Sequence, residues 1–227
     1  MMTRPPRLHA AAMIQLHHYP STASMAPHIA LRELGIPFEL VTVDRPNNAH
    51  KSPAYLRLNP NGLIPVLVDG ELVIYETAAI LLHLADTHPA AGLMPPLGTA
   101  ARAQAYKWLF WLSNTLQATL IAYFYPERWV AAGNAAGAME VKAQAEARIA
   151  GLLDQLDGQL AASGGPWLLG ADYGIADALA FTLCRWTRHF PRPARSLPHI
   201  APWQQRMLAR PAVQQVFAAE ALPQPWI

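Results

Sequence analysis

The chain has 227 residues, of which 52% are hydrophobic and 14% are charged, with a formal net charge of +2 at pH 7. This length suits one large or two modest domains with a well-buried core, and the weak, scattered positive charge gives no indication of a nucleic-acid partner. No apolar run is long enough to predict a membrane span, and the single cysteine excludes an intrachain disulfide or a cysteine-based metal site. We therefore expect a protein of the cytoplasm, with neither a membrane nor a nucleic acid as its partner.

The first part of the chain predicts a strand–helix–strand unit. Residues 1–12 lack the apolar core of a signal peptide, so we expect a disordered extension there. An alternating segment at residues 14–19 predicts a strand, and residues 38–43 predict a second one. Between them, Pro27 suits the first turn of a helix that ends at Gly35. This order favours a right-handed unit with parallel strands.

Residues 59–77 are the most informative stretch, reading Asn-Pro-Asn-Gly-Leu-Ile-Pro-Val-Leu-Val-Asp-Gly-Glu-Leu-Val-Ile-Tyr-Glu-Thr. They predict a turn, a strand that begins at a proline, an Asp-Gly hairpin, a second strand and a helix start. The bond before Pro65 can be cis, and the backbone beside Pro65 is held out of the sheet ladder, where it can pair with a peptide ligand. The carboxylate of Glu76 and the donors of Thr77 suit the zwitterionic end of a small peptide.

Two domains follow from this pattern. A strongly apolar helix at residues 77–88 completes a βαβαββα domain over residues 13–88, and the prolines and glycines of residues 89–98 predict a linker. The rest, residues 99–227, predicts an all-helical domain, because every patterned segment in it has helical periodicity. The predicted helices cover residues 100–125, 138–162, 175–189, 200–209 and 211–219.

Three motifs together carry a resemblance to a known family. They are Pro-His-Ile-Ala-Leu-Arg-Glu-Leu-Gly at residues 27–35, the stretch at residues 59–77, and Trp-Leu-Leu-Gly at residues 167–170 followed by Gly-Ile-Ala-Asp-Ala at residues 174–178. With them the chain resembles the cytosolic glutathione transferases, most closely the bacterial beta class. The resemblance implies a thioredoxin-like N-terminal domain, a helical-bundle C-terminal domain, glutathione as co-substrate and a homodimer.

The resemblance also implies that a hydroxyl stabilises the glutathione thiolate. A free thiol has a pKa of about 8.5, and a helix N-terminus or a hydrogen-bond donor lowers it. In the loop before the first helix the candidates are Ser24 first, Thr22 second and Tyr19 a distant third. Ser24 has the alternative role of a helix cap. Ala23 stands where the beta class has a cysteine, which excludes mixed-disulfide chemistry at that position.

Further residues are implied to bind the tripeptide. Pro65 corresponds to the cis proline of the thioredoxin-like fold, which leaves the backbone of Ile64 to pair with the cysteinyl part. Glu76 and Thr77 hold the γ-glutamyl amine and carboxylate, and Lys51 pairs with the glycyl carboxylate. The alternatives are an edge proline, an acid favoured by the helix dipole and a solvated lysine.

The second domain is expected to form the wall of the electrophile pocket. Gln117 and Ala118 stand where the beta class has a histidine and a lysine. Asn114 and Gln117 remain candidate polar contacts. Tyr123, Phe124 and Tyr125 either line an apolar pocket or pack in the core.

Several other residues have structural interpretations. Asp177 is expected to cap a helix that begins after Gly174, and Cys184 is expected to be buried and inert. The nine histidines show no metal-binding spacing, and adjacent His17 and His18 point to opposite faces of a strand, so we expect no metal site.

These observations favour an enzyme that conjugates glutathione to small apolar electrophiles. A non-catalytic binding or interaction protein is the alternative from a different class. Ala23, Gln117 and Ala118 favour it, whereas the Glu76-Thr77 pair argues against it. A glutathione-dependent isomerase or dehalogenase is a third possibility, because a fold does not determine a reaction.

Overall fold

The first half of the molecule contains a four-stranded mixed sheet in the order β2-β1-β3-β4. The computed structural model describes residues 13–227, so the disordered extension expected at residues 1–12 lies outside the described residues. β1 is parallel to β2 and antiparallel to β3, which confirms the predicted parallel unit and the Asp-Gly hairpin. The strands are β1 (Ile14–His18), β2 (Phe38–Thr42), β3 (Val66–Asp69) and β4 (Leu72–Tyr75).

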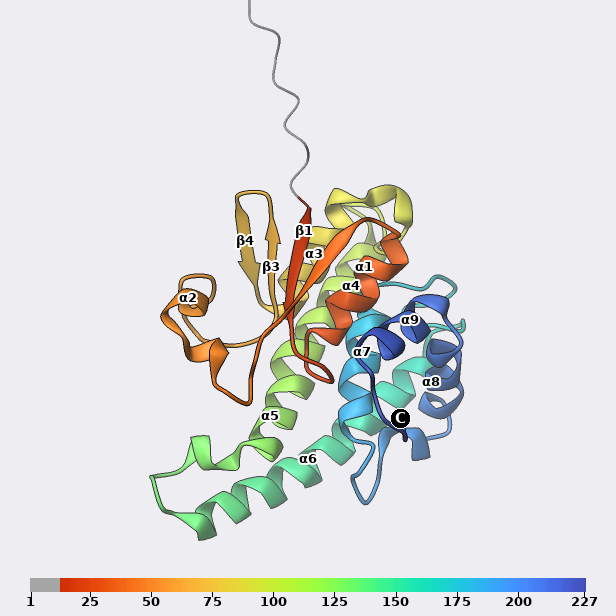
Figure 1. The fold of residues 1–227 in the computed structure, drawn as a ribbon. Helices are drawn as coiled ribbons and strands as arrows, with labels where there is room; N and C mark the ends of the chain where they lie inside the picture. Colours follow the sequence, from red (N-terminus) through yellow and green to blue (C-terminus); the bar gives the residue numbers. More distant parts are fainter. Residues whose placement is uncertain (1–12) are drawn as a thin grey trace, which may run out of the picture.

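Helices cover both faces of this sheet (Figure 1). α1 (Met25–Leu34) and α3 (Thr77–Thr87) pack on one face, where Leu16 and Leu67 are fully buried. α2 (Pro53–Leu56) lies on the other side, where Tyr55 packs in a separate small cluster. The alternating burial along β1 therefore reflects a sheet that is fully covered on one face and partly covered on the other.

The second half is helical, as predicted, with boundaries that differ by a few residues. α6 begins three residues earlier than expected, because the side chain of Asn134 accepts a hydrogen bond from the N–H of Gly137 at 2.9 Å. α7 ends at Trp186, because the Thr187 hydroxyl donates to the carbonyl of Cys184 at 2.7 Å. The helices are α4 (Ala100–Trp111), α5 (Ala118–Phe124), α6 (Ala135–Ala162), α7 (Ile175–Trp186), α8 (Ile200–Leu208) and α9 (Pro211–Ala219).

The single helix expected at residues 100–125 is interrupted. A π-helical segment, η3 (Leu112–Gln117), separates α4 from α5. A π-helical turn holds more residues than an α-helical turn, so side chains three positions apart no longer share a face. Helical periodicity in the sequence does not reveal such a local change of pitch.

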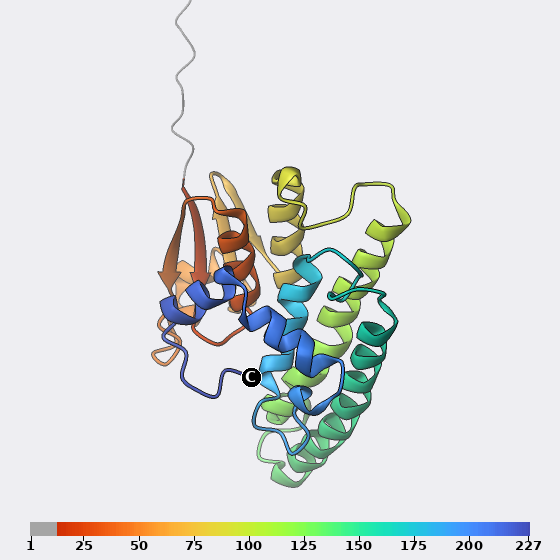
Figure 2. The same ribbon diagram turned by 90° about the vertical axis from the view of Figure 1, so that its right-hand side faces the viewer.

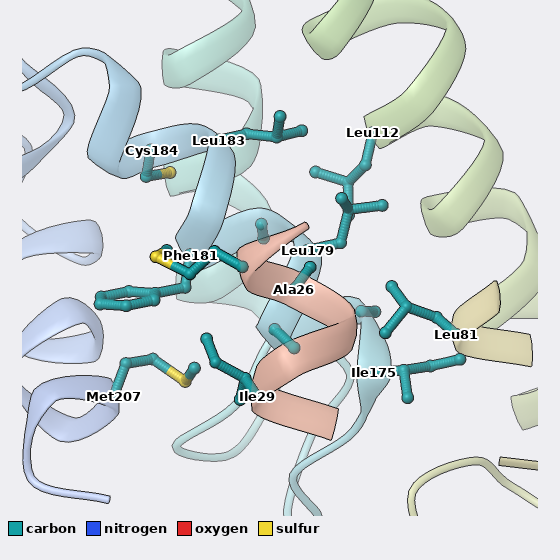
Figure 3. Close-up of a cluster of buried hydrophobic side chains, with 14 of the residues drawn as sticks. Ala26, Ile29, Leu81, Leu112, Ile175, Leu179, Phe181, Leu183, Cys184 and Met207 are labelled. Atoms are coloured by element: carbon teal, nitrogen blue, oxygen red, sulfur yellow. The ribbon is translucent and has the colours of Figure 1, made fainter. Parts of the chain in front are cut away.

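A continuous hydrophobic core joins the two halves. Figure 3 shows Ala26 and Ile29 of α1 among Ile175 and Leu179 of α7, with Leu81 of α3 beside them. α1 therefore packs on the sheet with one side and on the helical domain with the other. α9 also lies beside α1, so the end of the chain returns to the first domain (Figure 2).

Two residues with predicted structural roles lie in this core. The Asp177 carboxylate accepts hydrogen bonds from the N–H groups of Gly174, Leu168 and Trp203, the last through its indole nitrogen, at 2.9–3.1 Å. Cys184 is buried, and burial raises the pKa of its thiol. The capping role of Asp177 and the burial of Cys184 are thus as predicted. None of the helices described is long and apolar enough to cross a membrane.

Candidate functional site

The loop between β1 and α1 holds a compact group of hydroxyls. The Thr22 hydroxyl donates to the carbonyl of Tyr19 at 2.7 Å, and its oxygen lies 2.9 Å from the Ser24 hydroxyl. The Ser24 hydroxyl also donates to the Tyr19 carbonyl, at 3.1 Å. Ser21 turns the chain with a φ of 64°, a conformation uncommon for residues other than glycine. This turn precedes the positive end of the α1 dipole.

Accessibility separates the two candidate hydroxyls. Ser24 is fully buried, and its side chain makes no capping bond to the helix. Thr22 is half-buried and lines the main cavity described below. The Ser24 hydroxyl, predicted as the first candidate to contact a ligand sulfur, faces Tyr19 and Thr22 and does not line this cavity.

The segment before β3 is held by buried side chains. Tyr55 and Asn59 both donate to the carbonyl of Leu63, each at 2.9 Å. The Ile64–Pro65 peptide bond is cis, as the resemblance implied, and the antiparallel ladder to β1 begins only at Val66. Ile64 lines the cavity. Its backbone thus lies beside the sheet but outside the ladder, as predicted from Pro65.

Glu76 and Thr77 follow β4 directly. Because Val66 pairs with Tyr75, a continuation of the register places Glu76 across from Pro65. Glu76 has a φ of 74° and a ψ of 114°, and its side chain makes no capping bond. Such a conformation in a residue other than glycine is unfavourable and is concentrated at functional sites. Neither residue lines the main cavity: Glu76 is exposed, and Thr77 is buried.

Lys51 lies on the rim of the same cavity. Its ammonium group donates to the carbonyl of Asn61 at 3.1 Å. A Cβ at Gly62 would lie 2.7 Å from Lys51 Nζ, and Gly62 has a φ of 58°, so only glycine suits this position. Lys51 is exposed at this rim, where its ammonium group is accessible to a ligand.

The cavity between the two halves of the molecule has a volume of about 830 Å³. It brings together Thr22, Lys51, Ile64 and Gln117 among the predicted residues, and the predicted pocket residues Tyr123, Phe124 and Tyr125 also line it. Asn114 does not line the cavity and is exposed, because the π-helical pitch of η3 turns it away from the face of Gln117.

Comparison with known proteins identifies the family of this chain. Residues 20–87 match the model of the glutathione S-transferase N-terminal domain, and residues 112–211 match that of the C-terminal domain. Glutathione S-transferase GstA of Escherichia coli O157:H7 is 31% identical over 211 residues, which cover 92% of this chain and 100% of that relative. The chain belongs to the glutathione transferase family.

Solved glutathione transferases show the same fold. A homologue from Sulfitobacter with bound glutathione is 29% identical with a TM-score of 0.85, covering 92% of this chain and 99% of that one. The bacterial beta-class enzyme of Sphingomonas chungbukensis is also 29% identical, with a TM-score of 0.78, and covers 92% of this chain and 100% of that one. The predicted thioredoxin-like domain and helical domain are thereby confirmed.

Two departures from the beta class meet at the cavity of this glutathione transferase. Ala23 and Gln117, which the resemblance places at the cysteine and histidine positions of that class, both line it. Within residues 13–227, no group of three or more His, Cys, Asp or Glu side chains is placed to hold a metal ion.

Sequence reasoning missed a buried polar network behind the loop. Glu220, at the end of α9, accepts a hydrogen bond from the Ser21 N–H and lies 2.9 Å from Nδ1 of His28. The guanidinium of fully buried Arg185 donates to the Ser21 hydroxyl at 2.5 Å. No local motif marks Glu220 or Arg185, since both are distant in sequence from the loop that they hold.

Proposed function

We propose that this glutathione transferase conjugates the thiolate of reduced glutathione to small electrophiles with an apolar body. The supporting observation is that one cavity is lined both by Thr22 of the loop before α1 and by Ile64, which precedes the cis proline. The first residue offers a hydroxyl, and the second offers backbone groups outside the sheet ladder. A thiol on a peptide that pairs with Ile64 then lies near Thr22.

The tripeptide runs along three segments in this proposal. Glu76 and Thr77 bind the γ-glutamyl amine and carboxylate, the backbone of Ile64 pairs with the cysteinyl residue, and Lys51 binds the glycyl carboxylate. The register that places Glu76 across from Pro65 supports this path. Glu76 is exposed and has a positive φ, and both features suit a residue that binds a charged ligand.

Thr22 and the α1 N-terminus lower the pKa of the bound thiol, because both favour its charged form. For the Thr22 hydroxyl to donate to the sulfur, its hydrogen bond to the carbonyl of Tyr19 has to break. Ser24 then satisfies that carbonyl, since its hydroxyl also reaches it at 3.1 Å. Ser24 is thus a positioning residue in this proposal, and Thr22 is the catalytic one.

The chemistry is a nucleophilic substitution or addition. The thiol proton passes to solvent, the sulfur lone pair forms a bond to the electrophilic carbon, and a leaving group such as chloride departs with its bonding electrons. Thr22 stabilises the negative charge on the sulfur before the attack, at about 1–3 kcal/mol for a charge-assisted hydrogen bond.

The proposal includes a homodimer in the cytoplasm. Apolar side chains are exposed on the edge strand β4, at Leu72 and Val73, and on α4, at Phe110. Exposed apolar groups of this kind favour a protein partner such as a second copy of the chain. Reduced glutathione as co-substrate implies a reducing compartment. Sedimentation or light scattering measures the oligomeric state.

Calorimetric titration with glutathione, combined with a turnover assay on an aryl halide, tests the proposed function. We expect wild-type binding and turnover, and an affinity lowered about tenfold or more in Glu76→Gln, because a charged hydrogen bond is worth about 1.5–3 kcal/mol. Glu71→Gln, at the exposed hairpin turn, is the matched control and should bind normally. Absence of wild-type binding would contradict the proposal, and binding without turnover of any electrophile would support a non-catalytic carrier.

A further inference from the structure

The cavity is strongly cationic. Four side chains with permanent positive charge line it, whereas none of the described lining residues is Asp or Glu. Three of these charges act on the same side chain: burial, followed by the positive charges of Lys51, Arg45 and Arg128, lowers the pKa of His50. The four cations are Arg45, Lys51, Arg128 and Arg188.

Three of these cations have partners or a proposed role. The Arg45 guanidinium donates to the hydroxyl of Tyr125 at 2.5 Å, and the Arg128 guanidinium lies 4.0 Å from the centroid of the Tyr125 ring. Lys51 is bonded to Asn61 and is assigned to the glycyl carboxylate. Arg45 and Lys51 belong to the first domain, and Arg128 belongs to the second.

Arg188 has no role in the binding of glutathione proposed above. It follows α7, is half-buried, and donates to the carbonyl of Arg185 at 3.2 Å. None of the ion pairs found among residues 13–227 includes Arg188 or any of the other three cations. Its sequence neighbour Arg185 is a second buried cation, and burial lowers the pKa of Arg188. A partly desolvated guanidinium without an anionic partner is unfavourable, and an anionic ligand would offset that cost.

Aromatic side chains line the same cavity as Arg188. Trp186 and Phe190 flank Arg188 in sequence, and both line the cavity. The ring of Tyr123 lies 4.2 Å from that of Phe190, and the ring of Phe124 lies 6.3 Å from that of Trp186. The wall therefore suits a flat apolar body whose charged end reaches Arg188.

A charge count shows that glutathione alone does not match this cavity. With the γ-glutamyl group at Glu76 and Thr77, the glycyl carboxylate and the thiolate are the two anions that face the four cations. The remaining positive potential favours a further negative charge.

We propose that the electrophile carries a carboxylate or a similar anionic group on an aromatic body, and that Arg188 binds this group. This inference rests on the proposed function, since it specifies the substrate class of the same cavity. It assigns no role to Arg188 in activating the thiol, so the thiolate of glutathione forms equally well without it.

A matched substrate pair tests the inference. The anionic 4-chloro-3,5-dinitrobenzoate and the neutral 4-chloro-3,5-dinitrobenzamide have the same ring and the same leaving group. Each kcat/KM is divided by the rate constant of the uncatalysed reaction with glutathione, which removes their difference in intrinsic reactivity. We expect the wild type to prefer the carboxylate by about tenfold or more, the ratio that corresponds to one charge-assisted hydrogen bond.

Arg188→Gln should remove this preference, mainly through KM, and leave kcat/KM for the amide within about twofold. Arg148→Gln, at an exposed position of α6 outside the cavity, is the control for the change of net charge and should keep the preference. Equal use of both substrates by the wild type, or an equal loss of kcat/KM for both in Arg188→Gln, would overturn the inference. Neither result would contradict the proposed transferase function.

A binding measurement separates the inference from the proposed function. If neither substrate is turned over, calorimetry compares the glutathione conjugate of the benzoate with that of the benzamide, both made chemically. Tighter binding of the benzoate conjugate that is lost in Arg188→Gln would support the inference even then. Equal binding of the two conjugates would overturn it.

Discussion

The carboxylate of Glu220 accepts a hydrogen bond from the backbone N–H of Ser21, at 2.9 Å, across 199 positions of the chain. Ser21 is the residue with positive φ that turns the β1–α1 loop, and Thr22 follows it. Arg185 binds the Ser21 hydroxyl from the other domain. The conformation of the proposed catalytic loop is thus fixed by the end of α9 and by α7.

This relationship predicts that Glu220→Gln destabilises the protein. Burial, together with the neighbouring charge of Arg188, lowers the pKa of Arg185 to about 10, and the charge of Glu220 opposes this shift. Removal of the carboxylate leaves the buried guanidinium without compensation, so we expect a loss of about 2–4 kcal/mol in the free energy of unfolding. Chemical denaturation measures this loss. Glu140→Gln, at an exposed position of α6, should change little.

A double-mutant cycle distinguishes charge compensation from lost packing. Arg185→Met removes the buried cation, so the Glu220→Gln change should be less harmful in that background. Strictly additive losses in the double variant would show that Glu220 does not compensate Arg185.

Asp177→Asn should also destabilise the protein, through a different cause. The carboxylate of Asp177 accepts from three N–H groups, and an asparagine would turn an NH2 group towards at least one of them. A buried donor that faces another donor costs about 1–3 kcal/mol. Thermal unfolding should show a clearly lowered Tm, whereas Asp172→Asn, exposed in the preceding loop, should leave the Tm unchanged. An equal Tm for both variants would rule out the capping role.

Asp157 predicts a pH-dependent contribution to stability. Burial acts to raise its pKa, but hydrogen bonds from His199 and from the backbone N–H of Ile200 outweigh it, so the pKa lies below the ordinary value of 3.8. A pKa that is lower in the folded state than in the unfolded state adds stability above the unfolded value, and this stability is lost as the pH falls through the folded value.

The variant Asp157→Asn should therefore be less stable than the wild type by about 1–2 kcal/mol near neutral pH. The difference should shrink as the pH falls below about 4, where the wild-type carboxyl also becomes protonated. Urea unfolding at a series of pH values measures the difference. A gap that stays constant down to the acid limit of folding would disagree with this account.

Sequence periodicity was sufficient for most of the fold. Alternation in β1, the glycine at position 35 and the Asp-Gly turn at residues 69–70 are local signals, and each marks an element found in the structure. The interruption at η3 was not predictable, because apolar spacing in residues 112–117 fits either helical pitch. It matters for the site, since it decides that Gln117 and not Asn114 meets the cavity.

The candidate site also contains residues that the sequence predicts and residues that only the structure reveals. Ile64, Pro65 and Glu76 are marked by one contiguous motif, and their backbone features follow from it. Thr22 and Ser24 have the same chemistry two positions apart, so only the loop conformation shows which hydroxyl reaches the cavity. Arg188 carries no local signal, because its position depends on the point where α7 ends.

The pKa of the thiol of bound glutathione tests the central proposal most directly. The ultraviolet absorbance of the thiolate gives this pKa for the wild type and for Thr22→Val, with Ser24→Ala as a comparison that keeps the Thr22 hydroxyl. We predict a wild-type value below the ordinary thiol value of about 8.5, a rise of about one to two pKa units in Thr22→Val, and a smaller rise in Ser24→Ala. A thiol pKa in Thr22→Val equal to that of the wild type would contradict the assignment of Thr22 as the hydroxyl that holds the thiolate.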